Sequence, residues 1–241
     1  MRIILFAIST LILFSSCDHF RHGQHVDGNG VIQKQNRKVT SNFTGIEVSG
    51  DITLYIRQDS ARSVNIETDE NLLPYVFVVA EGDVLRIHPE SGFDLDPTKS
   101  VKVFVSGPLF KELHASGACS MIGETEISSS DPISIKLSGS CDAGLQLKAP
   151  KVIAQVTGAS TMTLRGETKD VSIDASGASH AKCFELMSEI GDVDVSGASN
   201  AEVFTSVRLD AAASGASGVR YKGNATVNKH ESGASSVKKA D

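Results

Sequence analysis

The chain of 241 residues is 40% hydrophobic and carries a net charge of −6 at pH 7, so it can bury a large core within one extended domain. The negative charge and the absence of basic clusters argue against a nucleic-acid-binding protein. Tryptophan is absent and aromatic residues make up only 5% of the chain, which counts against a sugar-processing groove built on aromatic platforms.

The first residues have the pattern of a bacterial lipoprotein signal. A short apolar run over residues 3–14 follows a basic residue and leads through two serines to Cys17. Such a run is too short for a stable membrane span and is typical of a cleaved secretory signal. We therefore expect a signal peptide over residues 1–16 and a lipidated Cys17 that anchors the protein in the cell envelope, at the outer membrane. An ordinary signal with an incidental cysteine is the alternative.

Residues 17–30 are polar and rich in glycine, which predicts a lipidated cysteine followed by a tether. His19, His22 and His25 recur at every third position of this segment. Histidines in such a pattern can bind a metal ion. Because a flexible tether makes a poor preformed cage, we expect solvated histidines here instead.

Residues 31–108 predict an irregular β region that begins the same solenoid as the rest of the chain. Alternating apolar residues predict strands, and the dipeptides around Gly82 indicate a turn. The expected strands lie within residues 43–56, 64–68, 84–88 and 101–105, with a helical turn at 69–74 and a loop at 91–100.

Residues 109–241 repeat one short motif, which predicts regular coils. The glycines of successive copies are 18 to 22 residues apart, a period typical of stacked repeat units. Five copies read Ser/Thr-Gly-Ala-Ser, at residues 157–160, 176–179, 196–199, 214–217 and 232–235, and two diverged copies precede them at 116–119 and 138–141.

The residues around each glycine alternate as they do in strands with one buried face. Val152, Ala154 and Val156 alternate before one glycine, and Met162 and Leu164 alternate after it in another phase. The glycine therefore marks a corner between two short strands, and one repeat makes one coil. The sequence predicts an all-β fold, a single-stranded parallel β-helix, with the right hand expected from parallel connections in general.

The residue after each Gly-Ala pair is expected to stack inside the solenoid. These residues are Ser160, Ser179, Ser199, Ser217 and Ser235, with Cys119 and Cys141 at the same repeat position. Tight corner packing explains the motif better than a catalytic serine, since no one serine is distinguished by a base or an oxyanion hole. Two alternatives stay open for the cysteines: a disulfide between neighbouring coils, or buried free thiols.

Four outward-facing aspartates on neighbouring coils form the candidate site. Carboxylates clustered in this way bind calcium or act on glycosidic bonds, although a solvated acidic face is the expectation. The members of this patch are Asp174, Asp192, Asp194 and Asp210. We expect no cofactor, and calcium at this patch is the alternative. In the last coil, Lys229 and Glu231 replace apolar residues, as expected for a protected end.

The order of several short motifs resembles the head GIN domain family. The resemblance rests on residues 43–56, 71–75 and 83–87 and on the Ser-Gly-Ala-Ser series, and it covers roughly residues 31–235. It implies a right-handed β-helix in envelope lipoproteins of Bacteroidetes-type bacteria, described as adhesin heads, and it brings no catalytic motif.

The first functional hypothesis is a lipid-anchored envelope protein without catalysis, with an adhesive or structural role. Its expected partners are the membrane, through the lipid anchor, and a glycan or surface protein. The alternative is a pectinase-like enzyme that acts on polysaccharide with the acidic patch, an analogy from the β-helix fold alone.

Overall fold

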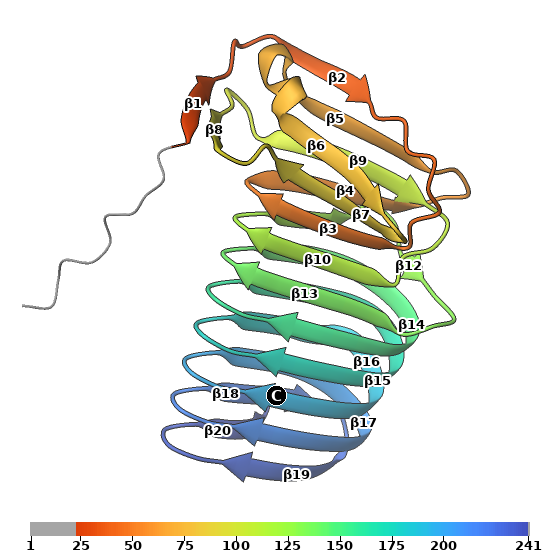
Figure 1. Cartoon of the computed structure of the whole chain (residues 1–241). Coiled ribbons are helices and arrows are strands. Elements are labelled where there is room, and N and C mark those ends of the chain that lie inside the picture. The colour runs from red at the N-terminus through yellow and green to blue at the C-terminus, as the bar shows by residue number, and fades with distance from the viewer. Residues whose placement is uncertain (1–22, 241) are drawn as a thin grey trace, which may run out of the picture.

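The computed structural model describes residues 23–240 and is built mainly of strands. A parallel β-solenoid of about six turns makes up most of the chain. An irregular N-terminal sheet region covers one end of the solenoid, and the last coil forms the other end (Figure 1). This confirms the predicted all-β solenoid with an irregular start. Among residues 23–240, no helix has the length and apolar character needed to cross a membrane.

The coils present two main faces, each built by parallel pairing of successive strands. The long strands bend from one face to the other: β14 (Asp142–Val156), β15 (Thr161–Ala175), β16 (His180–Val195) and β17 (Asn200–Ala213). Shorter strands on the first face are β3 (Gly45–Gly50), β10 (Glu112–Gly117), β13 (Ile133–Gly139) and β19 (Thr226–Glu231). Those of the second are β4 (Ile52–Gln58), β11 (Ser120–Gly123), β12 (Ile127–Ser128), β18 (Gly218–Lys222) and β20 (Ser236–Lys239).

The repeated glycine is required by the close stacking of the corners. Gly158 has a φ of 76°, and a Cβ on it would lie 2.3 Å from the carbonyl oxygen of Gly139 in the preceding coil. The N–H of Ala159 donates to that same oxygen at 2.7 Å. The backbone ladder therefore continues through the corner, and only glycine leaves room for it.

The interior follows the predicted phase. Leu164 is fully buried, while Thr163 beside it is only half-buried. The serine column is satisfied by backbone groups: Ser160 Oγ accepts from Cys141 N–H at 3.1 Å, and Ser179 Oγ donates to a carbonyl at 3.0 Å. Of the column, Ser160, Ser179, Ser199 and Ser217 are buried and Ser235 is half-buried.

The cysteines of the same column are buried free thiols. Cys119 Sγ donates to the carbonyl of Ser116 at 3.2 Å, and Cys141 Sγ donates to that of Ser138 at 3.2 Å. Each thiol thus donates to a carbonyl of its own corner, whereas the serines of later coils, such as Ser179, donate to a carbonyl of the preceding coil. Of the two alternatives for this pair, the structure has the free thiols.

The N-terminal region extends both faces of the solenoid with mixed strands. β9 (Val101–Gly107) pairs with β4 in parallel and with β5 (Ser63–Asp69) in antiparallel, and β5 also pairs with β2 (Ile32–Asn36). On the other face, β7 (Val84–Pro89) pairs with β3 in parallel and with β6 (Val76–Glu81) in antiparallel. The predicted helical turn is the 3-10 helix η1 (Glu70–Tyr75).

Two segments differ from the sequence-based expectation. The end of the expected tether forms β1 (Gln24–Asp27), and the expected loop at 91–100 contains β8 (Phe93–Asp96). The two strands pair only with each other, in parallel. Each is four residues long and carries few apolar residues, so local propensity gives little signal, and tertiary pairing decides the structure.

The last coil carries charge where earlier coils are apolar, as predicted. Lys229 lies opposite Ala211 and Glu231 opposite Ala213, and the two charged side chains form an ion pair at 3.5 Å. Both charged residues are exposed. They place charge at the open end of the sheet, which discourages edge-to-edge pairing.

Candidate functional site

The predicted acidic patch is brought together by the strand register, but it does not form a cage. Asp174 lies opposite Asp194, and Asp192 lies opposite Asp210. Asp210 pairs with Arg208 at 2.9 Å and accepts a hydrogen bond from an asparagine amide at 2.8 Å. Within the described chain, no three of these carboxylates bring ligand atoms within 4.8 Å of one another. Calcium binding at this face therefore stays a prediction.

The other predicted site residue, Cys17, lies outside the described residues, together with the signal peptide and two of the three tether histidines, His19 and His22. The described chain begins at Gly23, directly before β1, and β1 lies at the N-terminal end of the solenoid (Figure 1).

A groove of about 490 Å³ lies in the N-terminal region, where β3 and β7 meet the loop that follows β7. Parallel pairing places Glu47 of β3 opposite Arg86 of β7. The loop is held in position because the N–H of Glu90 donates to the carbonyl of Tyr75 at 2.8 Å, and the N–H of Phe93 donates to that of Glu90 at 3.3 Å. These hydrogen bonds hold the loop beside β3 and β7, where it forms one wall of the groove.

One guanidinium organises the charge of this groove. Nε of Arg86 lies 3.0 Å from a carboxylate oxygen of Glu81, and its terminal nitrogen lies 3.6 Å from one of Glu47. Glu90 also lines the groove and forms no ion pair among the described residues. The site thus combines several carboxylate acceptors with one fixed donor.

Two of the chain's aromatic contacts border the same groove. Phe93 packs on Tyr75 with ring centroids 4.7 Å apart, and Phe77 stacks on His88 at 5.8 Å. Phe93 and His88 line the groove itself. The groove therefore has aromatic rings in its wall, although the chain as a whole contains few aromatic residues.

Sequence reasoning missed this groove, because its walls come from segments about 40 residues apart that only the β3–β7 pairing joins. The alternating strand at 84–88 placed Arg86 on an outward face, and this was the one available signal. The facing strand and the position of the loop could not be read from the sequence.

Comparisons with known proteins agree with this architecture. The family model described as "Putative auto-transporter adhesin, head GIN domain" matches residues 42–225. A putative adhesin from Bacteroides fragilis NCTC 9343 has a TM-score of 0.82 at 18% identity, over 89% of this chain and 100% of that one. A putative adhesin from Parabacteroides merdae ATCC 43184 has a TM-score of 0.71 at 22% identity, over 90% of this chain and 100% of that one.

A further similar structure is a putative lipid binding protein from Parabacteroides distasonis ATCC 8503, with a TM-score of 0.70 at 22% identity, over 90% of this chain and 100% of that one. At these identities the likeness concerns the fold. No curated protein matches the sequence. The family model covers most of the chain, including every coil corner from Gly50 to Gly215. The chain therefore belongs to the head GIN domain family.

Proposed function

We propose that the protein is a lipid-anchored head of the cell envelope that binds a hydroxyl-rich ligand, such as a glycan, without catalysing a reaction. In this proposal Cys17 carries the lipid and the outer membrane is the location. The observation that carries the anchored arrangement is the position of β1, which begins only seven residues after Cys17 and lies at the N-terminal end of the solenoid (Figure 1). An anchor at Cys17 leaves the coils free to project from the membrane.

An adhesive role is supported by the family, which is described as adhesin heads, and by the adhesin names of similar structures. The solenoid fits such a role physically, because each coil contacts its neighbours through a continuous ladder. A rod of this kind holds its side surfaces in fixed positions, which keeps the ordering cost of ligand binding low.

The chemistry of the Arg86 groove supports a glycan as the ligand. Carboxylate oxygens of Glu47, Glu81 and Glu90 can accept hydrogen bonds from hydroxyl groups, and the unused N–H groups of Arg86 can donate to ring and hydroxyl oxygens. Phe93 offers an apolar ring face. Concave sites with a few convergent polar groups are the usual form of small-molecule and sugar sites.

Neither the described residues nor the comparisons support the polysaccharide-cleaving alternative. Asp174, Asp192 and Asp194 are exposed, and the half-buried Asp210 is held in an ion pair with Arg208.

The test uses the full chain purified in detergent, applied to an array of glycans and matrix proteins and also incubated with polygalacturonate. We expect saturable binding to at least one glycan and no cleavage. Binding to matrix proteins alone would contradict the glycan as ligand, and cleavage of polygalacturonate would contradict the absence of catalysis.

A further inference from the structure

A two-stranded ribbon at the edge of the N-terminal region carries four side chains of metal-binding type. β1 and β8 pair in parallel, with His25 opposite Asp94 and Asp27 opposite Asp96. Between the two aspartates of β8, Leu95 is half-buried and packs against the core. Because side chains alternate along a strand, the histidine and the three aspartates share the outer, exposed face of the ribbon.

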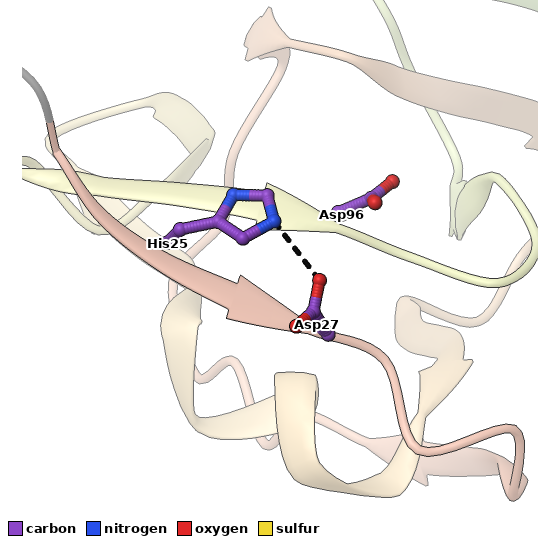
Figure 2. Close-up of side chains that lie close together, drawn as sticks. All are labelled: His25, Asp27 and Asp96. Carbon is purple, nitrogen blue, oxygen red and sulfur yellow. Dashed lines mark hydrogen bonds and ion pairs between the residues drawn. The ribbon is translucent and has the colours of Figure 1, made fainter.

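Figure 2 shows that His25, Asp27 and Asp96 lie close together on this face. Nε2 of His25 lies 2.9 Å from Oδ1 of Asp27, and its Nδ1 lies 3.5 Å from Oδ2 of Asp94. One ligand atom each from His25, Asp27 and Asp96 lies within 4.8 Å of the other two, an arrangement found nowhere else in residues 23–240. The nitrogen that faces Asp94 is thus distinct from the one that faces Asp27.

Hydrogen bonds at the end of the ribbon fix this arrangement. The side-chain amide of Asn71 donates to the carbonyl of Asp27 at 2.7 Å, and the N–H of Gly28 donates to the carbonyl of Asp96 at 2.8 Å. Just beyond, the buried carboxylate of Asp69 accepts backbone N–H groups from both following loops. His25 therefore lies on a strand that is held in position, and not on a flexible tether as the sequence predicted.

The negative charge of this face lacks a matching positive charge. Asp27 and Asp96 lie directly opposite each other on neighbouring strands, where like charges destabilise a sheet. In the described part of the chain, no lysine or arginine forms an ion pair with Asp27, Asp94 or Asp96, and His25 is the only partner. The charge of Asp27 is the main cause that raises the pKa of His25. A two-stranded ribbon is also marginally stable alone, so a bridging cation would stabilise it.

We propose that His25, Asp27 and Asp96 bind one divalent transition-metal ion, for which Zn²⁺ is the best fit, and that Asp94 orients the imidazole. Zn²⁺ is bound by imidazole nitrogen as well as by carboxylate oxygen, whereas calcium takes oxygen ligands alone. A carboxylate on the second imidazole nitrogen is the common outer partner of a metal-bound histidine.

The exposed side chains have room to rotate to the metal–ligand distances of about 2.0–2.2 Å that Zn²⁺ requires. Three protein ligands leave a fourth position for water or a group of another molecule. The bound ion would fasten β1, and with it the start of the described chain, to β8. This inference concerns the ribbon and does not depend on the glycan groove.

The test is titration of the full chain, purified in detergent without an affinity tag and treated with a chelator, with ZnCl₂ in a calorimeter. We expect one Zn²⁺ per chain, and at least tenfold weaker binding in His25→Ala and in the double variant Asp27→Asn, Asp96→Asn. His180→Ala, which removes an exposed histidine on the side of the solenoid, and the double variant His19→Ala, His22→Ala should bind as the wild type does.

Far-ultraviolet circular dichroism of each variant should match the wild type, since the changes are on an exposed face. The proposal is overturned if the wild type shows no saturable Zn²⁺ binding, or if binding survives in His25→Ala. It is also overturned if binding is lost only when His19 and His22 are replaced.

Discussion

The buried carboxylate of Asp69 accepts two hydrogen bonds from Thr98, one from the hydroxyl at 2.7 Å and one from the backbone N–H at 2.9 Å. It also accepts the N–H of Gly30 at 2.7 Å. A single side chain thus ties the end of β5 to the loops after β1 and β8. Gly28 packs so closely on this carboxylate that a Cβ there would lie 2.5 Å from it.

Asp69→Asn should lower the free energy of unfolding by about 1–3 kcal/mol, because an amide NH₂ would face donors that need an acceptor. Asp192→Asn, on an exposed strand face, should change it by less than about 0.5 kcal/mol.

Burial raises the pKa of Asp69, but the hydrogen bonds from Thr98 and Gly30 lower it more, so the net shift is downward. The ionised carboxylate of Asp69 therefore contributes its full stabilisation above its pKa in the unfolded chain, about 3.9. This stabilisation is lost as the pH falls through the lower pKa of Asp69 in the folded protein. Urea unfolding at pH 7 and at lower pH values measures the difference in the free energy of unfolding between wild type and Asp69→Asn. We expect this difference to become smaller only under acid conditions. A difference that does not change with pH would contradict this prediction.

Leu164→Asp should destabilise the protein by several kcal/mol, because Leu164 is fully buried and the new carboxylate would have no partner. Thr163→Asp, one residue earlier on the outer face, should cost far less. Thermal unfolding of both variants measures the difference. Equal losses would show that the assignment of inward and outward positions is wrong.

Gly158→Ala tests the stacking of the corners. The new Cβ would lie 2.3 Å from a backbone oxygen of the preceding coil, in addition to the strain of a positive φ. Gly30→Ala has nearly the same φ, 77°, but open space around the Cβ, so it measures the strain alone, about 1–2 kcal/mol. We expect Gly158→Ala to lose clearly more stability than Gly30→Ala in chemical unfolding. A similar loss in both would mean that the corners can move apart.

Cys17→Ala tests the anchor. The change should abolish incorporation of labelled fatty acid and should leave the protein soluble or as an uncleaved precursor, because the cysteine thiol is the proposed attachment point. Detergent phase partition and radiolabelling of whole cells measure both effects. Labelled acyl chains on the variant would contradict the lipoprotein proposal.

The solenoid was predictable because the repeated corner and the period-two alternation are local signals. Val156, Leu164 and Ala175 are buried as their alternation requires. The β1–β8 ribbon and the Arg86 groove were not predictable, since both depend on pairing between segments distant in the sequence. Glu47 and Arg86, for example, meet only because β7 pairs with β3. The acidic patch was predictable in part. The repeat predicted the register of its aspartates, but the ion pair of Asp210 with Arg208 depends on side-chain positions that the repeat does not give.

The most direct test of an adhesive head measures glycan binding by the wild type and by two arginine variants. Arg86→Ala removes the guanidinium that lines the groove, and Arg165→Ala removes another exposed guanidinium, which pairs with Glu185 at 2.8 Å on the side of the solenoid. With the glycan that binds the wild type on the array, surface plasmon resonance should give at least tenfold weaker binding for Arg86→Ala, about 1.4 kcal/mol, and unchanged binding for Arg165→Ala. Wild-type affinity in Arg86→Ala, or an equal loss in both variants, would contradict the account.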